Sequence, residues 1–339
     1  MGSLQSGQVL KHYRITDKLG QGGMGEVYRA EDTKLNRYVA IKLLTASTVE
    51  NETARRRLLQ EARSAAALNH PSIVTVHAID DHDGLDFIVM EYVEGETLKS
   101  VSERGPIPLP QLLDIGAQVA DALSTAHSLN IIHRDIKSAN ILLASASRAK
   151  VLDFGLAKTT HPLIEELDLE APTRFALTGA GIVLGTVPYM SPEQTRGEQL
   201  DGRTDIFSLG CVLYEAATGT LPFNGPSLLS IIHDIATVNP PPPSRFKNDL
   251  PAEFDLIIAR ALAKDKEQRY QSASEMADAL RSLKGASTSF PVIQPITGPL
   301  AADGELESFV GREPEMKQLD RLLRRATEGA GRVVFVTGE

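Results

Sequence analysis

The sequence has little of what a secreted or membrane-embedded protein needs. Its 339 residues contain a single cysteine, Cys211, which excludes an intrachain disulfide and suits a reducing compartment. It has no run of about 18 apolar residues, so no membrane span is expected in this chain. Its first residues form no apolar signal region. These absences predict a cytoplasmic protein.

Positive charge is also in short supply, with 35 Lys and Arg residues against 44 Asp and Glu residues and a net charge of −9. This balance argues against a broad nucleic-acid-binding surface, so we expect no nucleic acid as a partner. What is present is ordinary for a globular protein: 42% hydrophobic and 23% charged residues. The length fits one large two-lobed domain or about two average ones.

The apolar pattern changes along the chain. Short β-type runs fill residues 13–45 and 73–93, and residues 49–68 between them have helical spacing. From about residue 97 to 284 the pattern is mainly helical, most clearly over residues 109–127, 205–218 and 254–263. Residues 286–305 are aperiodic and rich in Pro, Ser, Thr, Gly and Ala, which indicates a linker.

Residues 20–25 read GQGGMG, and Gly20, Gly22 and Gly25 fit G-x-G-x-x-G. Dinucleotide-binding βαβ units and protein kinases both use this spacing over phosphates. Residues 26–42 have strand-type residues at both ends and a polar, turn-forming middle, which predicts strand–turn–strand. A dinucleotide-binding unit needs a helix directly after its glycines. The pattern therefore favours the kinase hairpin, and its second strand ends in VAIK at Lys42.

The strongest motif is HRDIKSAN at residues 133–140, which fits H-R-D-x-K-x-x-N and is followed by Asp153-Phe154-Gly155. Each motif alone could be a polar loop. After VAIK, and in this order, they form the protein kinase set. Residues 13–285 therefore resemble a eukaryotic-like serine/threonine protein kinase of the bacterial type.

The resemblance implies an α+β, bilobal protein-kinase fold. The N-lobe, residues 13–93, would be small and β-rich with one key helix, and the C-lobe, residues 94–285, larger and helical. Residues 1–12 would form an N-terminal segment and residues 286–308 a linker.

It also implies transfer of the ATP γ-phosphate to Ser and Thr hydroxyls of proteins, including the chain itself. Catalysis of this kind is mostly positioning and charge stabilisation. Asp135 would accept or orient the substrate hydroxyl. Lys137 would neutralise the transferring phosphate, and a lysine there is typical of serine/threonine kinases. Lys42 would contact the α- and β-phosphates and would be held by Glu61.

Asn140 and Asp153 are oxygen ligands suited to Mg²⁺, with Mn²⁺ as an alternative. Residues 88–98, IVMEYVEGETL, resemble the hinge whose backbone bonds the purine at Glu91 and Val93. The glycines would let backbone N–H groups approach the phosphates. The residues expected to contact ATP are Gly20, Gln21, Gly22, Gly23, Met24, Gly25, Val27, Ala40, Lys42, Met90, Glu91, Val93, Leu142 and Asp153.

Residues 185–194, GTVPYMSPEQ, resemble the peptide-docking loop and the A-P-E segment, with Ser191 replacing the usual alanine. Phe207 stands where the family often has tryptophan. The supporting side chains implied are Thr186, beside Asp135 and Lys137; Glu193 and Arg269, as a buried ion pair; and Asp205, as a brace of the catalytic loop.

Arg134 precedes the catalytic aspartate, and a cation there needs an anion to balance it. In such kinases a phosphate on the activation loop supplies that anion. Thr178 is the first candidate and Thr173 the second, because Ile182 occupies the commoner position and cannot accept a phosphate. The acidic insert at residues 163–172 has no assigned role.

Residues 309–339 follow a separate pattern. An amphipathic helix is expected after Pro314, and then the strand VVFV before Gly338. This resembles the start of a signal-transduction P-loop ATPase, cut off before its lysine. We expect the chain to be a fragment of a longer protein with C-terminal ATPase or sensor domains.

Two rival functions are weighed. A pseudokinase, a nucleotide-binding signalling scaffold, is disfavoured because Lys42, Asp135, Asn140 and Asp153 are all present. A metabolite phosphotransferase on the same fold is disfavoured by the peptide-docking loop, residues 185–194.

Overall fold

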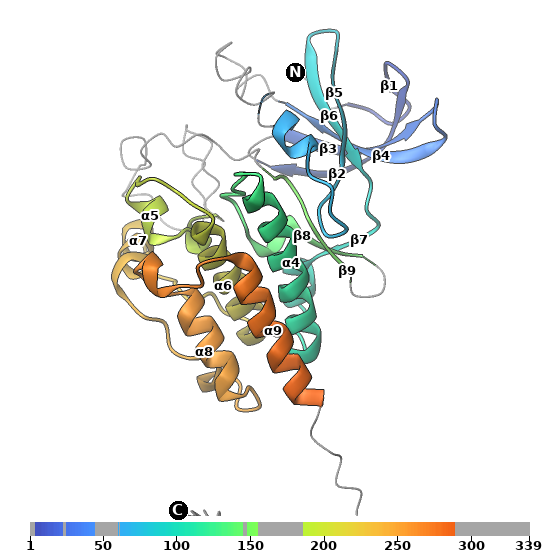
Figure 1. Cartoon of the computed structure of the whole chain (residues 1–339). Helices are drawn as coiled ribbons and strands as arrows, with labels where there is room; N and C mark the ends of the chain where they lie inside the picture. Colours follow the sequence, from blue (N-terminus) through green and yellow to red (C-terminus); the bar gives the residue numbers. More distant parts are fainter. Residues whose placement is uncertain are drawn as a thin grey trace, which may run out of the picture. The chain divides into compact units, whose positions relative to one another are not determined.

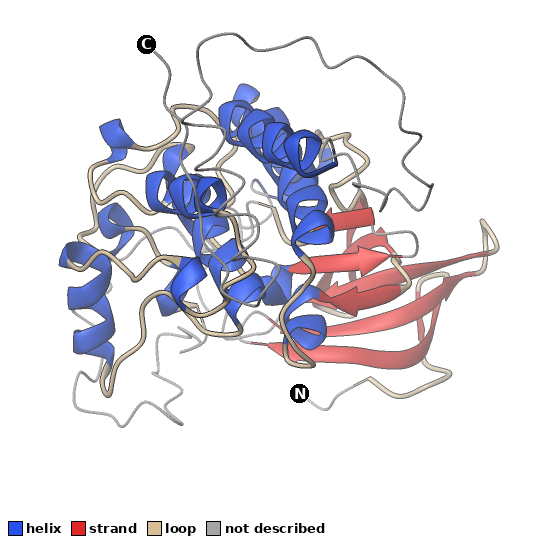
Figure 2. Cartoon of the chain, turned by 90° about the horizontal axis from the view of Figure 1, so that it is seen from below, coloured by secondary structure: helices blue, strands red, loops and turns tan. Residues whose placement is uncertain are grey.

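The structure is a computed structural model and describes residues 4–22, 25–44, 60, 62–144, 148–154 and 186–288. Within these, strands gather on one side and helices on the other (Figures 1 and 2). This arrangement confirms the predicted α+β architecture with a β-rich start and a larger helical part.

The first part of the chain forms an antiparallel sheet with strand order β1-β2-β3-β4-β6-β5. Its strands are β1 (Val9–Leu10), β2 (Tyr13–Gly22), β3 (Gly25–Asp32), β4 (Arg37–Leu43), β5 (Val76–His82) and β6 (Leu85–Glu91). A smaller sheet, β7-β8-β9, comprises Gly95–Thr97, Ile141–Ala144 and Arg148–Val151. Of the predicted helix over residues 49–68, residue 60 and residues 62–68 are described; residues 60 and 62–66 are helical, whereas residues 67 and 68 are not.

The glycine-rich stretch closes a hairpin between β2 and β3, in which Gly22 pairs with Gly25 and Gly20 with Val27. Gly25 has φ +136°, a backbone conformation that is open to glycine and strained for other residues. No helix follows the glycines, because β3 continues directly into its pairing with β4. The kinase-type hairpin is therefore confirmed over the dinucleotide-binding alternative.

The helical part is built around α6, whose side chains are almost all buried. Its helices are α3 (Leu98–Ser102), α4 (Leu109–Ser128), α5 (Pro192–Thr195), α6 (Arg203–Thr218), α7 (Leu228–Thr237), α8 (Ala252–Ala261) and α9 (Ala273–Thr288). Short 3₁₀ turns connect them: η1 (Ser138–Asn140), η3 (Val187–Tyr189), η4 (Pro243–Arg245) and η5 (Lys266–Gln268). Gly116 lets α4 approach α6 and α9 closely, since a Cβ there would lie 3.0 Å from Leu213 and 3.1 Å from Leu280.

The predicted helices over 109–127, 205–218 and 254–263 correspond to α4, α6 and α8, with ends shifted by up to two residues. The predicted N-terminal segment, residues 1–12, contains β1, because Leu10 is buried and pairs with Tyr13. One predicted boundary needs correction. The predicted linker begins too early, because α9 continues to Thr288, and no proline interrupts the chain before Pro291. None of the helices in the described ranges is long and apolar enough to span a membrane.

Candidate functional site

The HRDIKSAN segment follows the loop after α4 and ends with η1. Asp205, near the start of α6, holds its first residues in place. The Asp205 carboxylate is fully buried and accepts hydrogen bonds from the backbone N–H groups of His133 and Arg134, each at 2.8 Å. His127 Nε2 donates a third, also at 2.8 Å. Arg134 adopts φ +67°, a left-handed conformation that these bonds stabilise. The loop is thereby fixed to the most buried helix of the domain.

His133 is a packed structural residue. It is fully buried, and its Nε2 donates to the backbone oxygen of Leu152 at 2.7 Å, while Nδ1 accepts from the N–H of Asp135 at 3.3 Å. Its ring packs edge-on against Phe154, with centroids 4.7 Å apart. These contacts join the loop that carries Asp135 to the segment that carries Asp153.

Asp135, Lys137 and Thr186 meet in one cluster. Lys137 Nζ contacts the Asp135 carboxylate oxygens at 2.8 and 3.1 Å and donates to Thr186 Oγ at 2.8 Å. Residues 49 positions apart are thus joined through one ammonium group. Asp135 stays partly exposed, with 12% of its side chain accessible, so an incoming hydroxyl can reach it.

Asn140 is oriented by the same aspartate. Its Nδ2 donates to the backbone oxygen of Asp135 at 2.8 Å and to Oδ2 at 3.0 Å. With the nitrogen so engaged, the amide oxygen is the atom that Asn140 can present to a cation.

Lys42, on β4, meets Asp153 across the cleft at 2.8 Å. The lysine side chain is 6% exposed, whereas that of Asp153 is 27% exposed. Burial acts to raise the pKa of Asp153, but the Lys42 ammonium outweighs it, with smaller help from His133 and Lys137, and the pKa is lowered. Asp153 is therefore a carboxylate at neutral pH, and its φ of +59° places it in a strained, left-handed backbone position.

The predicted adenine contacts form an apolar cluster beside this pair. Ala40 and Met90 are buried, and Val27 and Val93 pack against the same cluster. Leu142 is half-buried on β8. A small hollow reaches from Met90 to Asp153 and Phe154, lined also by Ala65, Val74 and Val76.

The hinge residue Glu91 has a side-chain partner that sequence reasoning missed. Lys150 on β9 donates to its carboxylate at 2.7 Å, and the N–H of Thr75 donates at 3.2 Å. The backbone N–H of Glu91 returns a bond to the Thr75 oxygen at 2.8 Å. The Glu91 side chain is thus bound to β9 and to the residue that precedes β5. The only signal in the sequence is that Lys150 lies three residues before Asp153.

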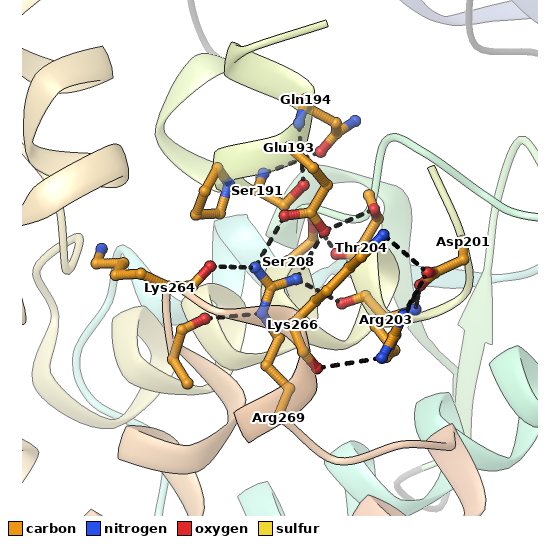
Figure 3. A network of polar contacts seen from close by, with 12 residues as sticks. Ser191, Glu193, Gln194, Asp201, Arg203, Thr204, Ser208, Lys264, Lys266 and Arg269 are labelled. Carbon is orange, nitrogen blue, oxygen red and sulfur yellow. Dashed lines mark hydrogen bonds and ion pairs between the residues drawn. The ribbon is translucent and has the colours of Figure 1, made fainter. Parts of the chain in front are cut away.

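Glu193 and Arg269 form the predicted buried ion pair, at 2.6 and 2.8 Å (Figure 3). Every N–H of the guanidinium donates, because the backbone oxygens of Ala263, Arg203 and Lys264 take the remainder. Thr204 adds a bond to the Glu193 carboxylate at 2.9 Å.

Helix α5 is joined to the loop that carries Asp135 by a separate bond. Gln194 Nε2 donates to the Arg134 backbone oxygen at 2.9 Å. The described part of the segment that is predicted to dock the peptide is thereby tied to both the HRDIKSAN loop and the helical core.

Several predicted residues fall outside the described ranges: Glu61, Gly23, Met24, Gly155, Thr173, Thr178 and residues 309–339. Their expected roles stay predictions. The described residues nevertheless bring together an anion-binding lysine, a carboxylate for a cation and a second carboxylate that can accept a proton. Such a set can hold a polyphosphate with its metal ion beside a hydroxyl group.

The comparisons with known proteins agree with this chemistry. The family model of the protein kinase domain matches residues 13–280 of the chain. The chain is similar to the serine/threonine-protein kinase PknB of Mycobacterium leprae, with 40% identity, and to PknB of Mycolicibacterium smegmatis, with 41%, each over 287 residues. Both alignments cover 83% of this chain but 44% of the relative, so the chain spans less than half the length of these relatives.

Solved structures give the same result. The crystal structure of the Mycobacterium tuberculosis PknI kinase domain has a TM-score of 0.66 and 30% identity to the chain. The match covers 84% of this chain and 100% of that one.

Proposed function

Because the chain belongs to the protein kinase domain family, we propose that it is a serine/threonine protein kinase that transfers the γ-phosphate of ATP to protein hydroxyl groups. The observation that carries the proposal is the cluster of Asp135, Lys137 and Thr186 beside the Lys42–Asp153 pair. The first group provides a proton acceptor with a cation next to it, and the second provides the contacts for a metal–nucleotide complex.

In the proposed reaction the oxygen of a serine or threonine hydroxyl attacks the γ-phosphorus. The bond from that phosphorus to the bridging oxygen of ADP breaks, and the hydroxyl proton passes to Asp135. Lys137 contacts both Asp135 and Thr186, so its ammonium lies beside the proposed proton acceptor and can stabilise the negative charge of the transferring phosphate. Lys42 would hold the α- and β-phosphates.

The donor set fits magnesium. Asp153 is a carboxylate, and Asn140 can offer its amide oxygen. Among the described residues, no group of three or more His, Cys, Asp or Glu side chains could cage a metal ion. This suits Mg²⁺, which is commonly held by one or two protein oxygens together with phosphates and water. When bound, Mg²⁺ neutralises phosphate charge, and we propose that Mn²⁺ can replace it.

For regulation, we propose that the kinase phosphorylates itself on Thr178, with Thr173 as the second candidate. Arg134 supports this, because its side-chain Nε is buried without a hydrogen-bond partner in the described part of the chain. A threonine phosphate would supply the missing acceptor and balance the charge beside Asp135.

We also propose that the protein works in the cytoplasm. ATP is its substrate, and Cys211 is a buried free thiol, as expected in a reducing compartment. The start of a P-loop ATPase at residues 309–339, with further C-terminal ATPase or sensor domains, stays a prediction.

A phosphate-transfer assay tests the function. The full chain is incubated with Mg²⁺–ATP and a basic protein, and phosphorylated residues are mapped on both. Phosphoserine and phosphothreonine are expected, including sites between residues 159 and 186 of the chain itself. Asp135→Ala should lower turnover by about 10²–10⁴-fold, the usual range for a positioned base.

ATP binding with no transfer would instead establish the pseudokinase alternative. Transfer confined to small metabolites would establish a metabolite phosphotransferase. A fully active sample without phosphate between residues 159 and 186 would remove the regulatory part of the proposal and leave the rest intact.

A further inference from the structure

Lys264 lies in the loop between α8 and η5, outside the catalytic cluster, yet its side chain is directed toward α7. Nζ donates to the backbone oxygens of Ile235 at 2.7 Å and Asp234 at 3.2 Å. The same ammonium lies 3.9 Å from the ring centroid of Phe223 and 5.6 Å from that of Phe207. These two rings are stacked, with centroids 5.8 Å apart.

The last turn of α7 has no basic residue of its own. Its final carbonyl groups carry the negative end of the helix dipole and need donors. Lys264 supplies both a donor and a positive charge from another element, and the aromatic pair holds the ammonium in place through cation–π contacts. Lys264 therefore fixes the C-terminal end of α7.

Helix α7 packs against η3 and α5, the two elements that follow Thr186. A displacement of α7 would therefore also displace η3 and α5. The residue directly before η3 is Thr186, which bonds to Lys137 beside Asp135. The backbone of Lys264 is held independently, since Arg269 donates to its oxygen at 3.2 Å and also binds Glu193 on α5 (Figure 3). Lys264 is thus linked to the η3–α5 segment in two ways. Its side chain binds α7, and its backbone oxygen accepts from Arg269, which binds Glu193 on α5.

We infer that Lys264 is a positioning residue for the protein substrate: its ammonium, by capping α7, holds the η3–α5 segment in the conformation that accepts the peptide next to Asp135. The inference rests on the proposed kinase function.

The charge of this group is sensitive to pH. Burial is the main cause that lowers the pKa of Lys264, to about 8. Three groups on the surrounding elements also affect the pKa of Lys264. The Cys211 thiol on α6 and the Asp234 carboxylate on α7 act to raise it, and the Arg269 guanidinium acts to lower it. A growing fraction of Lys264 becomes neutral as the pH rises through 8. A neutral amine caps the end of α7 more weakly and makes no cation–π contact.

The effect on global stability has the opposite sign. A lysine whose pKa is lower in the folded state than its ordinary 10.5 binds fewer protons when folded between about pH 8 and 10.5. Stability therefore rises with pH through this group in that window. Above pH 8 we expect weaker positioning of the peptide without a loss of fold stability from Lys264.

The test compares Lys264→Met, Lys264→Arg and the full wild-type chain, using a threonine-containing peptide at pH 7 to 9. At pH 7, Lys264→Met should raise the KM for the peptide about tenfold, as expected for lost charge-assisted hydrogen bonds at a helix end. The KM for ATP should stay within about twofold. The wild-type peptide KM should rise above pH 8, whereas Lys264→Arg should keep it low and constant, because arginine stays charged.

Lys266→Met is the matched control, since Lys266 is a neighbouring lysine that contacts Asp201 at 3.4 Å rather than α7. Its peptide KM should not change. An unchanged peptide KM in Lys264→Met, or an equal change in the KM for ATP, would overturn the inference. A wild-type pH profile shared by Lys264→Arg would overturn it as well, even if Lys264→Met did not fold.

Hydrogen exchange separates this inference from the proposed function. Amides of α7 and η3 should exchange faster in Lys264→Met than in wild type, whether or not the chain transfers phosphate. Absence of phosphate transfer in wild type would refute the kinase proposal, and unchanged exchange in α7 would refute the role of Lys264.

Discussion

Two ion pairs of this chain have different surroundings in the structure. Arg269 and Glu193, in the helical part, are almost without exposure, at 0% and 2% of their side chains. Lys42 and Asp153, between the sheet and the catalytic loop, are 6% and 27% exposed. In the first pair every guanidinium N–H is used by the protein, whereas the second keeps an accessible carboxylate at a strained φ of +59°.

The difference distinguishes an ion pair that supports the fold from one that is free to take part in the reaction. A buried pair that is fully hydrogen-bonded can bind nothing else, and its loss leaves a charge stranded in the core. A pair whose anion remains accessible can exchange partners when phosphates and a metal ion arrive. Substitutions should therefore divide the two pairs into one that fails in stability and one that fails in activity.

The largest effect is expected at the cleft. Lys42→Met or Asp153→Asn should reduce phosphate transfer below detection, because each removes a group that is proposed to contact the metal–nucleotide complex. In Lys42→Met the free energy of unfolding should fall by only about 1 kcal/mol, because the Asp153 carboxylate that is left unpaired stays within reach of water. Transfer assays and urea unfolding on the same samples measure both quantities.

Near-normal activity in either variant would refute the assigned mechanism. A loss of several kcal/mol in stability would instead place this pair with Arg269–Glu193 and would remove the contrast between them.

Arg269→Met should do the reverse. It leaves the Glu193 carboxylate buried without its guanidinium, and breaking such a pair typically costs about 3–5 kcal/mol. The matched control is Arg269→Met combined with Glu193→Leu, which removes both charges and should recover much of the loss. Urea unfolding measures the effect, and a single variant within about 1 kcal/mol of wild type would show that the pair is not the support described here.

The pH dependence of this pair has a defined sign. Burial acts to raise the pKa of Glu193, but its bonds from Arg269 and Thr204 outweigh it and the pKa is lowered from 4.5. The pair therefore contributes fully above about pH 4.5, and its contribution is lost as the pH falls through the lowered value. Arg269→Met should flatten this acid limb of the wild-type stability curve.

Much of this site is predictable because its motifs are local. The glycine hairpin, α4 and the HRDIKSAN motif follow from short stretches whose spacing is visible in the sequence. Thr186, which joins Asp135 and Lys137 from 49 residues away, is implied only by the resemblance to a family. The Glu193–Arg269 pair, 76 residues apart, was reached only through resemblance to a family, and so was the brace at Asp205.

The sequence does not show which distant side chains pair with one another or how the elements pack. Lys150 and Glu91 lie 59 residues apart, and Lys264 lies about 30 from the carbonyls it caps, so nothing in the local pattern joins them. Strand β1 has two residues, too few for a period. The end of α9 reads as a linker by composition, yet the helix packs along α4, and tertiary packing outweighs weak propensity.

The smallest expected effect tests whether the cleft has a support of its own. Lys150 is 12% exposed and holds the Glu91 carboxylate, and through it the hinge backbone that is expected to bond adenine. Lys150→Met should weaken ATP binding about tenfold, which corresponds to the loss of one charge-assisted hydrogen bond. The affinity for adenosine, which has no phosphates, should fall by the same factor. Asp153→Asn should instead weaken the binding of Mg²⁺–ATP and leave that of adenosine unchanged.

Glu91→Gln should reproduce the Lys150→Met result, and combining the two should add little, because both act on one contact. Calorimetric titration of both ligands measures these affinities. If Lys150→Met weakened ATP but not adenosine, Lys150 would belong with the phosphate-binding pair, and the cleft would have no separate support at its hinge.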